Sequence, residues 1–304
     1  MNERHFTYTN PALDYAVWDA IMSSKDINLE LTLSWYIAQK TLAEETTYIS
    51  VYFRNLNNGN RFGINEKEVF SPASLMKLPL LMAYLKWLQN EPGIFNIKLP
   101  VIPQESRNVY KQDIPPTEKL DVWKEYTVKE LLEHMIKYSD NQASTILEQR
   151  VPPQAYQNVF LDNGFPFPEQ AKNDGDLQIK IVDYAAPFRI LFNASYINKE
   201  LSAYALRLLS KTTFNEWLVA WVPSHIKVAH KFGERWKELS NGSTEKQLHD
   251  CGIIYYPTHP YILCVMTRWH DRNILKQIVA SISKRVYDEV DSQYTGTVAG
   301  STSN

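Results

Sequence analysis

The sequence predicts an α+β fold in which helices cover a mainly antiparallel sheet and an all-helical segment is inserted between the two parts of that sheet. Strand-like segments rich in β-branched and aromatic residues occur early, within 47–65, and again late, within 226–267. The chain between them has the apolar spacing that is typical of helices. This order favours helices layered on an antiparallel sheet. We therefore expect both ends of the chain to complete one sheet.

A helix and a hairpin are the first elements expected. Residues 29–42 have a helical pattern, and residues 47–54 are rich in the β-branched and aromatic types that favour strands. Asn58 and Gly59 follow, and this dipeptide is a strong signal for a tight hairpin turn. Residues 61–65 should therefore return as the second strand.

From about residue 71 the pattern becomes helical. Ser71 and Pro72 form a favourable N-cap and first-turn pair ahead of a long apolar run. Thr127 and Glu130 have the spacing of a capping box, which opens another helix. The other helices expected in this block are those at 141–149, 181–192 and 199–209.

Strands return near the end, and a long helix follows them. The expected strands are the short apolar segments 226–232, 252–256 and 261–267. Asp271 is a favourable N-cap for a final helix that reaches about Val290.

The chain is expected to form one catalytic domain, residues 1–304, with two subdomains. The α/β subdomain would comprise about 1–66 and 222–304, and the helical subdomain about 67–221. A ligand groove should form where the two meet, since such junctions are common binding sites.

Composition excludes several kinds of partner. The net charge of −2 gives no strong field to attract nucleic acid or an anionic membrane. The apolar run at 78–88 is far shorter than the ~20 residues of a membrane span. No signal peptide is visible, so the protein is cytoplasmic or its export segment is missing from the chain. His225 and His230 would point to opposite faces of one strand, and no metal or organic cofactor is expected.

Two cysteines, Cys251 and Cys264, flank a predicted turn at 257–260 almost symmetrically. Directly opposed strand residues could form a disulfide bridge. Most cysteine pairs of this kind stay as small buried hydrophobic side chains, so two free thiols are the favoured interpretation.

The first motif with chemical potential is Ser74-Leu75-Met76-Lys77, which places a hydroxyl and an amine one helical turn apart. A serine needs a neighbouring base to become a nucleophile, and a lysine can be that base if burial or another cation lowers its pKa. The spacing alone is weak, because it recurs at Ser224/Lys227, Ser243/Lys246 and Ser281/Lys284. Only Ser74 lies near the start of an apolar helix, where backbone N–H groups favour a developing anion.

Two further motifs follow. Ser139-Asp140-Asn141 lies between two expected helices and offers a hydroxyl and an amide, although alone it would be an ordinary helix cap. Lys231-Phe232-Gly233 ends an expected strand. Its lysine could hold a substrate carboxylate, and its glycine would let a substrate backbone lie against the strand edge.

Together and in this order, the three motifs resemble the S-x-x-K, S-D-N and K-T-G signature of class A β-lactamases and penicillin-binding proteins. The chain reads SLMK, SDN and KFG. The resemblance covers about 45–290 and includes Phe70-Ser71-Pro72-Ala73 before the first motif and Asn141-Gln-Ala-Ser-Thr after the second. It implies a serine β-lactamase or DD-peptidase-like fold.

The resemblance also implies catalytic roles. Ser74 would attack the substrate carbonyl and form an acyl-enzyme. Lys77 would be the general base, directly or through water, a choice that is disputed for the family. Ser139 would relay a proton to the leaving nitrogen. The backbone N–H groups of Ser74 and Glu234 would form the oxyanion hole.

Substrate binding follows from the same resemblance. Lys231 would lie near Ser139 and Lys77, lower the pKa of Lys77 and attract a substrate carboxylate. Asn141 would bind the amide of the substrate side chain. The candidate substrate-binding residues are Asn141, Phe232, Gly233 and Glu234.

The chain departs from the family pattern in two places. Phe232 stands where a threonine or serine hydroxyl usually helps to hold the substrate carboxylate. The Glu-x-x-Leu-Asn loop, whose glutamate activates the deacylating water in class A enzymes, has no equivalent. The segment 165–176 is shorter and offers only Glu169, Asp174 and Asp176, of which Glu169 is the best candidate.

The leading hypothesis is a monomeric serine hydrolase that acts on small-molecule β-lactams and deacylates slowly. One alternative is a D-alanyl-D-alanine peptidase or penicillin-binding protein, which would act on a D-alanyl peptide. Another is a non-catalytic β-lactam- or peptidoglycan-binding module. The resemblance implies an extracytoplasmic location, periplasmic or secreted.

Overall fold

The computed structural model describes residues 8–10, 24–44, 48–103, 114–170, 177–239 and 241–295. Its centre is a five-stranded antiparallel sheet with the strand order β2-β1-β10-β9-β8. The strands are β1 (Tyr48–Asn55), β2 (Arg61–Ile64), β8 (Val228–Glu238), β9 (Thr244–Ile254) and β10 (Tyr261–Trp269). Strands from both ends of the chain thus form one sheet, as the sequence predicts.

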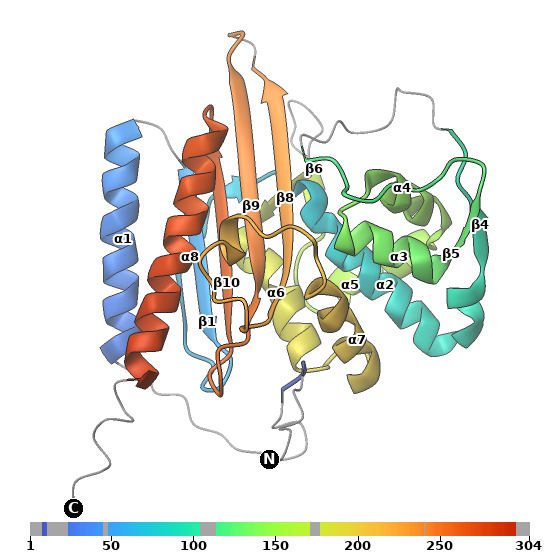
Figure 1. Cartoon of the computed structure of the whole chain (residues 1–304), viewed down its shortest axis with the longest axis horizontal. Coiled ribbons are helices and arrows are strands. Elements are labelled where there is room, and N and C mark those ends of the chain that lie inside the picture. The colour runs from blue at the N-terminus through green and yellow to red at the C-terminus, as the bar shows by residue number, and fades with distance from the viewer. Residues whose placement is uncertain are drawn as a thin grey trace, which may run out of the picture.

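Helices cover both faces of this sheet (Figure 1). Two long helices, α1 (Ser24–Glu44) and α8 (Arg272–Thr295), pack together on one face. The helical block lies against the other face, where α6 contacts β1, β9 and β10. Its helices are α2 (Lys77–Asn90), α3 (Val128–Lys137), α4 (Asn141–Arg150), α5 (Pro153–Leu161), α6 (Ile181–Phe192) and α7 (Lys199–Leu209).

Short elements complete the fold. The small strands are β3 (Val69–Phe70), β4 (Lys98–Pro100), β5 (Glu125–Thr127), β6 (Glu169–Gln170) and β7 (Leu177–Lys180). The 3₁₀ helices are η2 (Ala73–Met76), η3 (Pro92–Asn96) and η4 (Trp217–Val219). Of these, η2 matters most for the site because it leads directly into α2.

The alternation of side chains along β10 separates two hydrophobic cores. Leu263 and Val265 face the core beneath α1 and α8, whereas Ile262 and Met266 face the core shared with the helical block. Helix α2 lies at the centre of that second core, and its residues from Lys77 to Leu85 are all buried. A helix that is apolar on every side needs this position.

Several local predictions are confirmed. Gly59 has φ +78° in the β1–β2 turn, a conformation that glycine adopts without strain. Thr127 and Glu130 form the reciprocal capping box of α3. The carboxylate of Asp271 accepts the backbone N–H groups of Asn273 and Ile274 at the start of α8.

Other local predictions were wrong. Ser71 does not cap a helix: the chain enters η2 after Pro72 with no side-chain cap, and the backbone N–H of Ser71 donates to the side chain of Gln247 instead. Strand β9 begins at Thr244, well before the predicted 252, because its first half is polar and has no apolar signal. Strand β8 runs on to Glu238, and His225 precedes it rather than lying within it.

The two cysteines are also not free thiols. Cys251 and Cys264 face each other directly in the register of β9 and β10, and the structure joins them as a disulfide. Both are buried in the core shared with the helical block. Direct opposition of two inward-facing residues on paired strands brings the sulfur atoms together.

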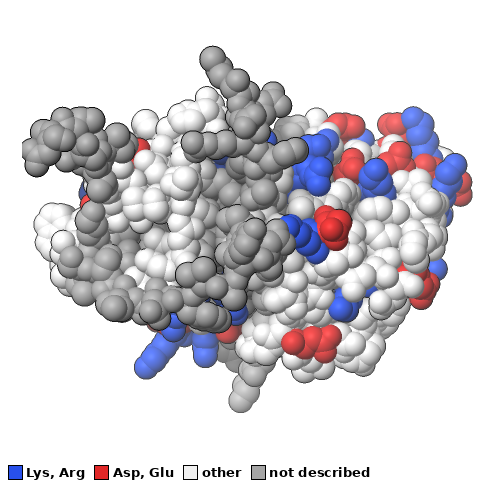
Figure 2. Space-filling view, turned by 90° about the horizontal axis from the view of Figure 1, so that it is seen from below, with Lys and Arg blue, Asp and Glu red and all other residues white. Residues whose placement is uncertain are grey.

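The surface agrees with the low net charge. On the face shown in Figure 2, acidic and basic side chains of the described residues lie next to one another over the helical part and do not separate by sign. None of the helices in the described part of the chain has the length and apolarity of a bilayer span.

Candidate active site

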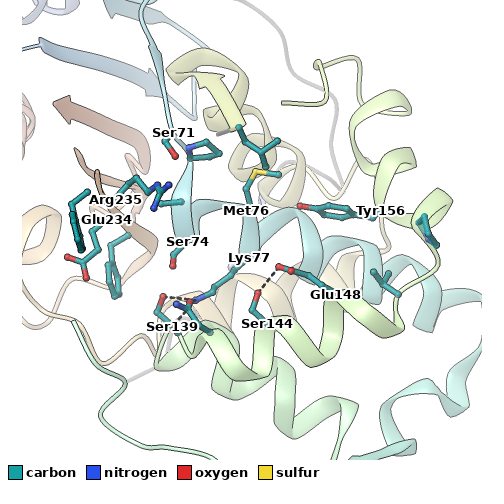
Figure 3. Close-up of a pocket in the computed structure, with 18 residues that line it drawn as sticks. Ser71, Ser74, Met76, Lys77, Ser139, Ser144, Glu148, Tyr156, Glu234 and Arg235 are labelled. Atoms are coloured by element: carbon teal, nitrogen blue, oxygen red, sulfur yellow. Dashed lines mark hydrogen bonds between the residues drawn. The ribbon is translucent and has the colours of Figure 1, made fainter. Parts of the chain in front are cut away.

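A cavity of about 640 Å³ lies between η2, the start of α4 and strand β8. Six of the residues expected to act in catalysis or binding line it, namely Ser74, Lys77, Ser139, Asn141, Phe232 and Glu234. The β8 side of the cavity is formed by Phe232, Glu234, Arg235 and Trp236. Figure 3 shows these side chains converging from the sheet and from the helical block.

Ser74 lies in η2, close to the edge strand β8. Its neighbour Ala73 has φ +48°, an uncommon conformation for a residue with a side chain, and such strain is often found at functional sites. Gly233 on β8 is buried against this segment: a Cβ there would lie 3.1 Å from both the carbonyl oxygen of Pro72 and the side chain of Leu75. The glycine therefore permits close packing of η2 on the strand.

The chain just before Ser74 is attached to strand β9. The backbone N–H of Ser71 donates to Gln247 Oε1 at 2.9 Å, and its carbonyl oxygen lies 3.0 Å from His249 Nε2. The N–H of Thr267 donates to His249 Nδ1, so Nε2 carries the proton in this arrangement. Burial lowers the pKa of His249 to about 4, which keeps the ring neutral. Sequence reasoning missed this attachment, whose only signal is two polar residues in a buried strand.

Lys77 makes contacts at the centre of the site. Its Nζ donates to the carbonyl oxygen of Ser139 at 2.5 Å and to Asn141 Oδ1 at 2.7 Å, and lies 3.3 Å from Ser139 Oγ. Burial lowers the pKa of Lys77 to about 7, although the carboxylates of Asp140 and Glu148 oppose this shift. A substantial neutral fraction is therefore present near neutral pH, and a neutral amine can accept a proton.

Ser139 lies in the turn between α3 and α4 and is fully buried. Its φ of +53° is again uncommon for a residue with a side chain. The next residue, Asp140, caps α4 by accepting the backbone N–H groups of Gln142 and Ala143. The tripeptide therefore both caps a helix and presents a hydroxyl to the site.

Lys231 approaches the same hydroxyl from strand β8. Its Nζ donates to Ser139 Oγ at 2.9 Å and to the carbonyl oxygen of Phe232 at 2.7 Å. Burial holds the pKa of Lys231 well below its usual value, and the charge of Lys77 lowers it further. The two lysines and Ser139 thus meet as the three motifs predict.

Phe232 and Glu234, which follow on β8, have different surroundings. The ring of Phe232 stacks on Phe214, with centroids 4.1 Å apart, and is nearly buried. The carboxylate of Glu234 accepts the backbone N–H of Ile114 at 2.6 Å and lies 3.5 Å from Arg272. Phe232 therefore gives the cavity an apolar wall, and Glu234 connects β8 to neighbouring segments.

Sequence reasoning missed several lining residues. Arg235 and Trp236 were missed because strand β8 was expected to end at 232. The others lie toward α4 and α5 and are Ser144, Glu148, Val151, Pro153 and Tyr156. Glu148 and Tyr156 gave no signal beyond ordinary helical residues.

The segment between α5 and α6 contributes little to the described site. The backbone of Glu169 pairs with Gln178 between β6 and β7, but its side chain lies outside the described residues, as do Asp174 and Asp176. Among the described residues of this connection, Leu177 lines the cavity.

A metal centre has no support in the described part of the chain, where no cluster of three or more His, Cys, Asp or Glu side chains could hold an ion. His230 does have an acidic partner, with Nδ1 2.9 Å from Asp250 Oδ1 in a buried pair. Asp250 also accepts the backbone N–H of Leu218 at 3.3 Å, so this pair connects β8 and β9 to η4.

Comparisons with known proteins identify the family and the fold. The model of a family described as "Beta-lactamase enzyme family" matches residues 35–290. Among solved structures, "Structure of PBP-A" is similar at 19% identity and TM-score 0.70, over 87% of this chain and 96% of that chain. A search of curated proteins found no match.

Two further solved structures have the same fold. A β-lactamase from Sphaerobacter thermophilus is similar at 19% identity and TM-score 0.70, over 87% of this chain and 97% of that chain. A β-lactamase from Chitinophaga pinensis is similar at 17% identity and TM-score 0.73, over 86% and 99%.

Proposed function

Because the chain belongs to the β-lactamase enzyme family, we propose that it is a serine hydrolase of the class A type that opens β-lactams through an acyl-enzyme on Ser74. The observation that carries the proposal is the meeting of Lys77 and Lys231 at the hydroxyl of Ser139, in the cavity that Ser74 lines. A nucleophile, a base of lowered pKa and a proton relay are the parts that acyl transfer needs.

Acylation begins with attack of Ser74 Oγ on the lactam carbonyl. The neutral amine of Lys77 accepts the hydroxyl proton, directly or through water, because its pKa of about 7 allows this near neutrality. The backbone N–H groups of Ser74 and Glu234 stabilise the oxyanion that forms.

Collapse of this intermediate breaks the C–N bond. Ser139 gives its hydroxyl proton to the departing nitrogen and is reprotonated by the ammonium of Lys77, which lies 3.3 Å from its Oγ. The amine is then neutral again, and the acyl group remains on Ser74.

Substrate is held from two sides. On the α4 side, the amide of Asn141 accepts from Lys77 through Oδ1 and so presents its NH₂ group to the carbonyl of the substrate side chain. On the β8 side, Lys231 attracts the substrate carboxylate, and Phe232 offers an apolar wall in place of the family's hydroxyl. Arg235 lines the same side and supplies a second positive charge.

Deacylation is proposed to be slow. The described residues between α5 and α6 bring no carboxylate into the cavity, and the sequence of this connection has no Glu-x-x-Leu-Asn run like the one that carries the loop glutamate of class A enzymes. The same observation favours a second candidate, a D-alanyl-D-alanine peptidase or a penicillin-binding protein that turns over slowly. In either case we propose a monomer that works outside the cytoplasm on a small molecule or a D-alanyl peptide.

Mass spectrometry after mixing the protein with benzylpenicillin tests these functions. Rapid product formation supports a β-lactamase, and an adduct that persists supports the penicillin-binding alternative. If neither an adduct nor product forms, the chain is a non-catalytic binding module on the same fold, and the proposed hydrolase is wrong.

A further inference from the structure

One face of helix α4 lines the cavity beyond the catalytic lysine. Asn141, Ser144 and Glu148 share that face, because residues three and seven positions along a helix project from the same side. The hydroxyl of Ser144 donates to Glu148 Oε1 at 2.9 Å, which holds the carboxylate back toward the start of the helix. Figure 3 shows Glu148 on the opposite side of Lys77 from Ser139.

The cavity has a distinct end around this carboxylate. Its walls there are mainly apolar, and they are Met76, Val151, Pro153, Tyr156 and Leu177. Leu177 is on the short β7 strand and Met76 is in η2, while the others come from α5 and from its connection to α4. The space is therefore shaped for an aliphatic or aromatic group with one polar end.

Among the described residues that line this end of the cavity, Glu148 is the acidic one. Its carboxylate is accessible from the cavity, yet the surrounding protein removes hydration and raises its pKa. The charge of Lys77 lowers the pKa of Glu148 and so opposes part of this rise. The N–H groups of Lys77, however, donate to Ser139 and Asn141. The hydroxyl of Tyr156 is kept protonated, because burial and the charge of Glu148 raise its pKa. A cation that entered here would restore favourable interactions to the carboxylate.

The path from the reacting centre to this carboxylate follows the helix. In the proposed function, Asn141 binds the amide of the substrate's acyl side chain, which then extends along α4. Each turn of an α-helix advances about 5.4 Å, so Ser144 and the carboxylate it holds lie roughly one turn beyond Asn141. A side chain with about four methylene groups after its carbonyl spans this distance.

We propose that Glu148 and Ser144 form a subsite for an ammonium group at the end of the substrate's acyl side chain. The proposal rests on the proposed function and names the substrate class: β-lactams or D-alanyl peptides whose acyl side carries an amine. Glu148 determines specificity in this arrangement and takes no part in bond breaking.

Two penicillins with nearly identical shapes test the proposal. Both are made from 6-aminopenicillanic acid, one with a 5-aminopentanoyl side chain and one with a hexanoyl side chain, so that a methyl group replaces the ammonium. The second-order rate of acylation of the protein by each compound is measured by mass spectrometry. We expect the wild type to favour the ammonium compound about tenfold or more, the effect of one charge-assisted hydrogen bond.

Two variants locate the effect. Glu148→Gln should reduce the ratio of the two acylation rates to about one, and because the ratio is taken within one protein it is independent of any change in the pKa of Lys77. Glu200→Gln on α7 removes a carboxylate that does not line the cavity, and it should keep the full preference. A penicillin with an aminoacetyl side chain, which is too short to reach Glu148, should respond to Glu148→Gln as the hexanoyl compound does.

The proposal is overturned if the wild type acylates equally fast with both compounds, or if Glu148→Gln retains the preference. If Glu148→Gln retains the preference and also slows hydrolysis of both acyl-enzymes equally, Glu148 activates water instead of binding the ammonium group. If neither compound acylates the wild type, the proposed function itself fails, and the subsite has no substrate to recognise.

Discussion

The ammonium groups of Lys77 and Lys231 share one acceptor, the hydroxyl oxygen of Ser139, at 3.3 and 2.9 Å. Lys77 comes from a helix in the middle of the helical block and Lys231 from the edge strand of the sheet. Burial lowers the pKa of both lysines, and the charge of Lys77 lowers the pKa of Lys231 further. This pairing joins the two layers of the molecule at the position where the chemistry is proposed.

The nucleophile is the first prediction. Ser74→Ala should abolish covalent labelling by a β-lactam, because no other serine of this spacing lines the described cavity. Ser224→Ala, Ser243→Ala and Ser281→Ala should leave labelling unchanged. Intact-mass spectrometry of the four variants checks this, and labelling that survives Ser74→Ala would refute the assigned nucleophile.

Acylation should depend on the protonation of Lys77. Its pKa is about 7, and the neutral amine is the base, so the acylation rate should rise with pH through this value. Between pH 6 and pH 8 the increase should be about tenfold. Stopped-flow acylation rates measure it, with circular dichroism as a control for folding. A rate that is flat over this range would exclude Lys77 as the base.

Phe232→Thr should have opposite effects on rate and stability. The new hydroxyl supplies a hydrogen bond to the substrate carboxylate, worth about 1.5–3 kcal/mol if the site is dry, so acylation should become faster. The lost ring leaves Phe214 without its stacking partner, and truncation of a buried aromatic side chain costs about 3–5 kcal/mol. Thermal unfolding and burst-phase kinetics measure the two effects. Unchanged or slower acylation would mean that Phe232 itself contacts the substrate.

Acid should destabilise the protein through His249. Its folded pKa is depressed to about 4, whereas an unfolded histidine titrates near 6.5, so the unfolded chain gains a proton first as pH falls. Stability from this group is fully present above pH 6.5 and is lost progressively between 6.5 and 4, by about 3 kcal/mol in total.

Urea unfolding of wild type and His249→Gln at several pH values isolates this contribution. Glutamine can still donate to the carbonyl of Ser71 but does not titrate, so its stability should change less between pH 6.5 and 4. Parallel pH profiles for the two proteins would show that His249 makes no such contribution.

The slow step should be deacylation. A burst of product should precede slow turnover. A general base that activates the deacylating water typically increases the rate about 10²–10⁴-fold, and the sequence lacks the Glu-x-x-Leu-Asn run that carries this base in class A enzymes. Glu169→Gln should change the slow phase little. Quenched-flow kinetics measures both phases. Rapid turnover without a burst, stopped by Glu169→Gln, would mean that the short connection does present a base.

Much of this arrangement is predictable from the sequence, for physical reasons. Strands β1 and β10 and the helices from α2 to α4 have strong apolar periodicity or caps, and three motifs at fixed spacing locate Ser74, Lys77, Ser139 and Lys231. Helix α5 and the first half of β9 were missed, because the former is short and the latter is polar. Glu148 was missed because a glutamate within a helix is ordinary in sequence, and only the fold shows that it lines the cavity.

The attachment of Ser71 to Gln247 and His249, together with the pairing of Tyr48 with Arg268, has a consequence for biosynthesis. Strand β1 can pair with β2 as soon as both are made, but its other neighbour is near the end of the chain. Loop closure over such separations is slow and must wait until residue 268 has left the ribosome. The nascent chain therefore stays open, and its nucleophile stays unformed, until nearly all of the protein has been synthesised.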